Sequence, residues 1–321
     1  MQRTIRALVA VVAGLAAWLA VLPAGALERH PLPPADVDLV GALRTVVTRH
    51  EDTFVDIGQA NHLGYSELKW ANPEIDPWLP GAGREVVLPT RYILPATARS
   101  GVVLNLPEMR VYYFPRAAGT GPREVWVLAA SIGRMDWQTP LGSTRITQKV
   151  ADPAWHPPES IREEHAADGR PLPTVVPPGP DNPLGRHALR LGLPGYLLHG
   201  TNRPNGLGMR VTHGCVRLFP QDVAQLFESV SVGEQVLLLD QPVKFGRLFG
   251  RIFVEVHPPL EEQMEGFGDG AAHASRALAD ARIGTGEVDW PRLRAALKAR
   301  SGLPVDVTAA APSPAATAAS R

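Results

Sequence analysis

Hydrophobic side chains alternate with polar ones through much of the middle of the chain, with a repeat of two residues. Alternation of this kind predicts β-strands with one buried face. Residues 102–106 and 109–114 show the pattern on both sides of a short turn at Pro107 and Glu108, which is typical of a hairpin. The same pattern predicts further strands at residues 125–129, 144–147, 189–191, 196–198 and 235–239.

One helix is predicted among these strands. Pro220 occupies its first turn, where proline is favoured, and Val223, Leu226 and Phe227 fall on one face. Many short strands with one principal helix predict a mainly β fold, a β-rich sandwich, for residues 101–240.

The connection over residues 155–182 is too long for a plain turn. It is rich in proline and also contains Glu163, Glu164 and His165. Long connections inside a compact domain are often active-site lids, so we expect a functional flap here. Trp137 and Trp155 are candidates for covering the cleft, although aromatic residues at such places also pack into cores.

Residues 42–94 show a different pattern, with a strand at 43–47, a helix after Asp52 and Thr53, a second helix at 65–71 and a strand at 85–88. Thr53 is a suitable N-cap, and Asn72 with Pro73 ends the second helix. The order strand, helix, helix, strand predicts a small α+β module.

Both ends of the chain differ from the middle. Arg3 and Arg6, an apolar run over 7–22 and small residues at 24–26 predict a signal peptide over residues 1–26, with an uncleaved membrane anchor as the alternative. Residues 305–321 are rich in Ala, Pro, Ser and Thr and predict a disordered tail. Residues 241–304 form an extension to which the sequence assigns no chemistry, with one helix over 289–297.

Composition narrows the class of protein. Lys and Arg together number 32, as do Asp and Glu, and this balance argues against a nucleic-acid-binding protein. Glycine (30) and proline (32) are abundant, which favours short strands and turns over long helices. The chain has one cysteine, so it can form no intramolecular disulfide.

That cysteine lies in the most informative stretch of the sequence. Cys215 follows Gly214 and is two residues after His213, while His199 ends a predicted strand and is followed by Gly200. A nearby imidazole can take the proton of a thiol that attacks a carbonyl group. The Gly200 carbonyl can fix the imidazole tautomer, and backbone N–H groups around Gly214 can stabilise an oxyanion.

Three other interpretations fit the same residues. A single cysteine is often a buried apolar residue. Two histidines and a cysteine are also a partial zinc site, although no further histidine or carboxylate lies close in sequence. His213 alone can be a structural histidine.

The stretch Thr212-His213-Gly214-Cys215-Val216-Arg217, preceded by His199-Gly200-Thr201, resembles the signature of the L,D-transpeptidase (YkuD-type) catalytic domain. The resemblance covers residues 101–240 and implies a β-rich domain without metal or cofactor. It implies Cys215 as nucleophile, His199 as general base and His213 as a second imidazole near the thiol. Arg217 would bind a substrate carboxylate or brace the loop. The pocket residues it implies are Thr212, Tyr196, Asn202, Gly208 and Met209.

Residues 42–94 resemble the LysM module, which binds peptidoglycan, through Asp52-Thr53, Asn72-Pro73 and Leu79-Pro80-Gly81; Glu51 stands where that family usually has glycine. Together the resemblances imply a periplasmic enzyme of the Gram-negative branch that acts on tetrapeptide stems. The acyl acceptor stays open between a second stem, a lysine of an outer-membrane lipoprotein, a D-amino acid and water, which would make the enzyme an L,D-carboxypeptidase. A non-catalytic wall-binding protein is the alternative from another class.

Overall fold

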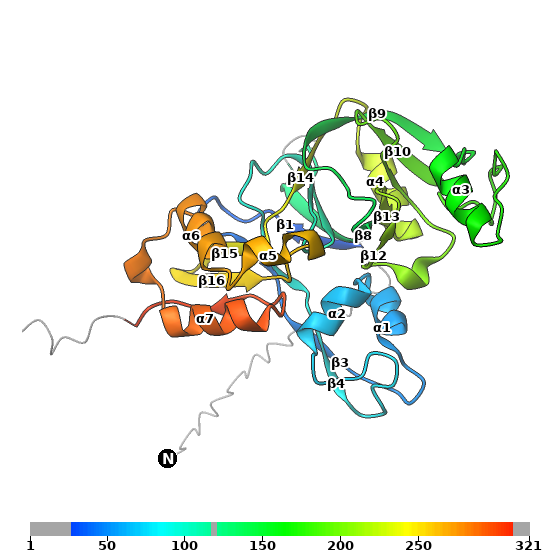
Figure 1. The fold of residues 1–321 in the computed structure, drawn as a ribbon. Coiled ribbons are helices and arrows are strands. Elements are labelled where there is room, and N and C mark those ends of the chain that lie inside the picture. The colour runs from blue at the N-terminus through cyan, green and yellow to red at the C-terminus, as the bar shows by residue number, and fades with distance from the viewer. Residues whose placement is uncertain (1–26, 117–120, 311–321) are drawn as a thin grey trace, which may run out of the picture.

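The computed structural model describes residues 27–116 and 121–310 (Figure 1). The predicted signal peptide and residues 311–321 of the predicted tail lie outside the described residues. Within the described part of the chain, every helix is too short or too polar to cross a bilayer.

A β-sheet that closes on itself forms the centre of the molecule. It closes because β8 (Glu124–Gly133) pairs with β7 (Arg110–Phe114) through its first half and with β13 (Val216–Leu218) further on. From β13 the ring continues through β11 (Leu197–His199), β10 (His187–Leu191), β9 (Gly142–Ala151), β14 (Gln235–Leu239) and β6 (Gly101–Asn105) back to β7. Two more strands, β1 (Glu28–Pro31) and β12 (Arg210–Thr212), pair with β8 outside the ring.

Seven strands of this sheet correspond to segments with the predicted two-residue repeat, whereas β1, β12 and β13 were not predicted. The prediction of a mainly β fold is confirmed. Val102 and Leu104 of β6 enter the main core, while Val103 between them faces a second buried cluster outside the ring. The predicted helix is α4 (Pro220–Ser229), and its Val223 and Leu226 pack into the main core. The strands next to the candidate site are therefore fixed by apolar packing on the opposite face.

The N-terminal module (residues 42–94) has the predicted order of elements. Strand β3 (Arg44–Val47) pairs with β4 (Glu85–Leu88), and α1 (Phe54–Asn61) and α2 (Tyr65–Ala71) lie between them in the sequence. Thr53 caps α1, because its hydroxyl accepts the Asp56 N–H. A second pair of strands, β2 (Leu39–Gly41) and β5 (Arg91–Ile93), borders the module.

The C-terminal part (residues 241–310) is a folded unit with its own core, which corrects one prediction. Residues 305–310 belong to it and not to a disordered tail: β17 (Val305–Asp306) pairs with β16, and Val307 is completely buried. The Val-Asp-Val-Thr run at 305–308 is too short to be distinguished by composition from the Ala/Pro-rich sequence that follows it.

The other elements of the C-terminal part are β15 (Val243–Leu248), β16 (Arg251–Val256), α5 (Met264–Phe267), α6 (Ala271–Asp280), α7 (Trp290–Ala299) and the short 3₁₀ turns η2 (Glu261–Gln263) and η3 (Thr285–Glu287). The helix predicted over 289–297 is α7, capped by Asp289.

A buried cluster of charges joins the three parts of the molecule. Arg110 of the central sheet donates to Glu67 of the N-terminal module at 2.8 Å and to Glu255 of the C-terminal part at 3.2 Å. Lys244 of the C-terminal part lies 2.9 Å from Glu108 of the sheet. Removing one member of such a buried pair leaves an uncompensated charge, so these contacts fix the parts relative to one another.

Candidate active site

Two adjacent parallel strands bring the candidate residues together. Strand β11 ends at His199, and β13 begins one residue after Cys215; in their register Leu198 pairs with Val216 and His199 with Arg217. Leu198 and Val216 are buried in the core, so the alternating residues point the other way. His199, Cys215 and Arg217 therefore share one face.

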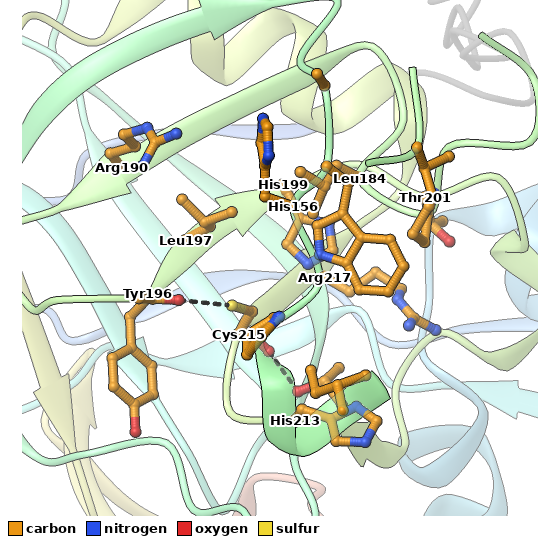
Figure 2. A pocket seen from close by; sticks show the side chains of 18 of the residues that line it. His156, Leu184, Arg190, Tyr196, Leu197, His199, Thr201, His213, Cys215 and Arg217 are labelled. Atoms are coloured by element: carbon orange, nitrogen blue, oxygen red, sulfur yellow. Dashed lines mark hydrogen bonds between the residues drawn. The ribbon is translucent and has the colours of Figure 1, made fainter. Parts of the chain in front are cut away.

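That face opens into a cavity of about 720 Å³ (Figure 2). The flap contributes Trp155, Ile161 and Val176 to the wall. Cys215, His199, His213 and Arg217 all line the same cavity, as do the predicted pocket residues Thr212, Tyr196 and Asn202. Seven of the residues singled out in the sequence therefore line one cavity.

The Cys215 thiol is partly exposed and donates to the Gly195 carbonyl at 3.5 Å. Burial raises the pKa of the thiol, and a backbone hydrogen bond at Leu197 and the charge of Arg217 oppose that shift. In the described part of the chain no hydrogen bond joins the sulfur to either imidazole. The resting Cys215 side chain is therefore a protonated thiol rather than a thiolate.

His199 is 5% exposed, and its Nδ1 lies 2.6 Å from the Gly200 carbonyl, as the sequence predicted. Since a carbonyl only accepts, Nδ1 carries the proton and Nε2 has the free lone pair. Burial lowers the pKa of His199 to about 4, and the positive charge of Arg217 adds to that effect. The ring is neutral at physiological pH.

His213 contacts the flap rather than the thiol. Its Nε2 lies 3.0 Å from Oε2 of Glu164, and the Trp137 ring meets the His213 ring edge-on at 5.2 Å. Glu164 also accepts from Arg134 at 2.7 Å, and this hydrogen bond lowers the pKa of Glu164. The sequence placed Glu164 in the flap but gave it no role.

The flap itself contains the helix α3 (Glu159–Ala167) and is closed at its base. Trp155 and Val176 exchange two backbone hydrogen bonds of 2.9 and 2.8 Å. The fully buried Asn182 donates to the carbonyls of Pro153 and Pro177 and accepts from Leu184 N–H. The flap is thus an ordered wall of the cavity.

Arg217 is a half-buried cation without a carboxylate partner among the described residues. Its Nε is buried and makes no hydrogen bond, and burial together with the charge of Arg203 lowers its pKa. The described residues thus give Arg217 no structural salt bridge through which it could brace the loop. A half-buried guanidinium in this state favours an anionic ligand.

The loop before the nucleophile is held by a residue that the sequence analysis missed. Gly214 has a φ of +98°, which favours glycine, and a Cβ there would lie 2.8 Å from the Tyr196 ring. The buried Thr139 hydroxyl donates to the Gly214 carbonyl at 2.7 Å, and the Thr212 hydroxyl donates to the Cys215 carbonyl at 2.5 Å. Thr139 lies 75 residues away in sequence, so no local motif indicates it.

Two residues predicted for the pocket lie outside its lining. Met209 is part of the ladder behind it, where its carbonyl accepts from Ile132 N–H at 3.3 Å. Gly208 instead meets Gly64 of the N-terminal module. Both follow a 3₁₀ turn, η1 (Pro204–Gly206), which carries the chain away from the cavity.

The cysteine and the two histidines do not form a metal-ligand cluster. Within the described residues, Glu108, Glu255 and His257 are the one group of three or more with ligand atoms within 4.8 Å of one another. Lys244 and Arg110 already lie within ion-pair distance of both of those carboxylates. The group fits a charge network better than a metal site.

Comparison with known proteins agrees with this geometry. The YkuD model, the L,D-transpeptidase catalytic domain, matches residues 99–238. The chain is 37% identical to the probable L,D-transpeptidase YcfS of Escherichia coli (strain K12), over 91% of this chain and 92% of that protein. It is 39% identical to YbiS of the same strain, over 86% and 90%, and 38% identical to ErfK/SrfK of Salmonella typhimurium, over 88% and 92%. The chain therefore belongs to the L,D-transpeptidase family, with a YkuD-type catalytic domain.

Proposed function

We propose that this chain is a peptidoglycan L,D-transpeptidase with Cys215 as nucleophile and His199 as general base. The observation that carries the proposal is the position of both residues on one face of β11 and β13, open to one cavity. The chain matches the probable L,D-transpeptidases YcfS and YbiS over 92% and 90% of their length, which supports the same activity here.

The donor is a tetrapeptide stem, and the bond that breaks joins a diamino acid to the terminal D-alanine. Sγ of Cys215 bonds to the carbonyl carbon while the thiol proton passes to Nε2 of His199. The C–N bond then breaks, the imidazolium returns the proton to the leaving amine, and a thioester remains on Cys215. An acceptor amine then attacks the thioester carbonyl, the C–S bond breaks, and a proton from the amine passes through Nε2 of His199 to restore the Cys215 thiol. One amide thus replaces another, and no cofactor is required.

The residues around the pair have supporting roles in this proposal. The Gly200 carbonyl keeps the proton of His199 on Nδ1, which leaves Nε2 to act as the base. The N–H groups at Gly214 and Cys215 are the proposed oxyanion donors. His213, held by Glu164, orients the loop that carries the thiol.

Arg217 is the proposed partner of a stem carboxylate. A half-buried guanidinium whose Nε has no partner gains a bidentate contact when a carboxylate binds. The same event neutralises a charge that holds down the pKa of His199, so substrate binding strengthens the base. Thr212, Tyr196 and Asn202 complete the pocket around the stem.

The acceptor defines the biological role and can be one of four classes. A second stem gives a 3–3 cross-link, a lysine of an outer-membrane lipoprotein gives covalent anchoring, a D-amino acid gives exchange, and water gives L,D-carboxypeptidase activity. We propose a periplasmic location after removal of residues 1–26, with residues 42–94 acting as a LysM-like module toward peptidoglycan. The strand, helix, helix, strand order of that module supports this assignment.

Incubation of the mature protein with tetrapeptide muropeptides tests the proposal. We expect release of D-alanine, and with each added amine a product whose mass identifies the acceptor. Cys215→Ala should release none, and a chelator should have no effect. Loss of activity to the chelator, or D-alanine release by Cys215→Ala, would contradict the proposal.

A further inference from the structure

The segment between the two proposed catalytic residues is held from outside the catalytic domain. Residues 204–212 connect the strand of His199 to the loop of Cys215. On one side, Tyr65 N–H donates to the Leu207 carbonyl at 3.0 Å and Ser66 N–H donates to the Gly208 carbonyl at 3.2 Å. These amides belong to the first turn of α2, whose N–H groups have no partner within the helix.

The N-terminal module is seated closely enough to fix this contact. A Cβ on Gly208 would come within 2.2 Å of the Cα of Gly64, so the two backbones touch. Next to them, Nδ1 of His62 lies 2.6 Å from Oδ1 of Asp222 in α4, and both side chains are buried. The module thus contacts the connecting segment and the principal helix together.

The C-terminal part holds the same segment from its other end. Arg210, the first residue of β12, donates to Glu262 twice, at 2.7 Å and 3.1 Å, and its Nε donates to the Gly133 carbonyl at 3.1 Å. The Arg210 side chain is 13% exposed and that of Glu262 17%. A bidentate charge-assisted pair at this degree of burial restricts the position of Arg210 and also stabilises the contact between the two segments. Two residues later, Thr212 holds the Cys215 carbonyl.

We propose that Glu262 of the C-terminal part is a positioning residue for the nucleophile, acting through Arg210, with the N-terminal module bracing the same segment at Leu207 and Gly208. This inference rests on the proposed function. It gives the C-terminal part a role in catalysis, because a displacement of about 1 Å at a reacting group can slow a reaction by roughly a hundredfold.

Glu262→Gln in the full chain tests the proposal, with Glu261→Gln as the matched control. Glu261 is adjacent, 68% exposed and no closer than 3.8 Å to Arg210. The readouts are the saturating rate and the half-saturating concentration for acylation of Cys215 by a carbapenem, normalised to titrated active sites. Normalisation removes any loss that comes only from misfolded protein.

We expect Glu262→Gln to lower the saturating rate at least about tenfold with little change in the half-saturating concentration. Glu261→Gln should stay within about twofold of the wild type. Arg210→Gln should show at least the same loss, since it also removes the hydrogen bond to the Gly133 carbonyl. The double variant should lose no more than Arg210→Gln alone, because that variant already lacks the contact with Glu262. If Glu262→Gln does not fold, Glu262→Asp, which cannot reach both guanidinium nitrogens, should show a smaller loss of the same kind.

Equal normalised rates in Glu262→Gln and Glu261→Gln would overturn the inference while leaving the proposed function intact. A loss that appears only in the half-saturating concentration would also overturn it. Failure of the wild-type protein to acylate at Cys215 would instead contradict the proposed function itself.

Discussion

At the scale of single residues, burial holds both members of the proposed pair in their neutral forms. It raises the pKa of the Cys215 thiol and lowers that of His199 to about 4. Even if the Cys215 thiol had an ordinary pKa near 8.5, complete transfer of its proton to His199 in the resting protein would cost roughly 6 kcal/mol. In the resting protein the neutral thiol and imidazole are therefore strongly favoured over a thiolate–imidazolium pair.

The pH dependence of thiol alkylation follows from these two shifts. Between about pH 4 and 6.5 an ordinary histidine gains a proton, but His199 stays neutral because its pKa is lowered. No imidazolium then stabilises a thiolate in acid. We expect the rate of iodoacetamide labelling of Cys215 to rise steadily from pH 5 to 9. A rate that is flat from pH 5 to 7 would indicate an ion pair and contradict this.

Gly214→Ala should damage both stability and activity. The new methyl group meets the Tyr196 ring at 2.8 Å, and the positive φ adds strain of about 1–3 kcal/mol. The urea midpoint and D-alanine release measure the two effects. Gly206→Ala is the control, since no atom lies within 4 Å of its added carbon. Equal midpoints for the two variants would show that the Gly214 loop is not constrained as described.

The motif indicated the proposed catalytic residues but not the contacts that hold them in place. His199 and Gly200 are adjacent at the end of a predicted strand, and Cys215 lies in a short motif with His213 and Gly214. The local sequence pattern and the chemistry of these residues were therefore enough to single them out. Glu164 reaches His213 across 49 residues and Thr139 reaches Gly214 across 75. Contacts at such separations depend on the register of the folded sheet, which a single sequence does not display.

At the scale of elements, the flap is held to the rest of the catalytic domain by weak contacts that a single substitution can remove. Glu164 links its helix to His213 and Arg134 through partly exposed contacts, which are individually weak. Glu164→Gln should raise deuterium exchange in residues 159–167 by roughly two- to fivefold. Glu163→Gln is the control, because Glu163 is exposed. Equal exchange in the two variants would show that Glu164 does not hold the flap.

Element types were predictable wherever one periodicity dominated. Seven strands of the central sheet and α2 lie close to where the pattern placed them, because apolar spacing reports directly on which face is buried. The strands β1, β12 and β13 were not predicted, since each has only three or four residues and is too short to show a period. Closure of the sheet was not predictable. Closure requires the long strand β8 to pair with both β7 and β13. The hydrophobic pattern of one strand does not indicate which other strands pair with it.

At the scale of the whole molecule, the C-terminal part is integral to the structure. Val307 is completely buried within its core. Val307→Ala should lower the free energy of unfolding by roughly 2 kcal/mol, through lost burial and the cavity left behind. Val232→Ala, at a 61% exposed position, should change it little. Urea denaturation measures both, and an unchanged midpoint for Val307→Ala would mean that residues 305–310 do not pack as described.

Intact-mass measurement of the protein incubated with a synthetic tetrapeptide stem tests the mechanism most directly. We expect the wild-type mass to increase by that of the stem without its D-alanine, with the added group on Cys215. Cys215→Ala should gain no mass, and His199→Gln should acylate about 10²–10⁴-fold more slowly. A stem attached elsewhere, or D-alanine released by Cys215→Ala at the wild-type rate, would show that another group performs the reaction.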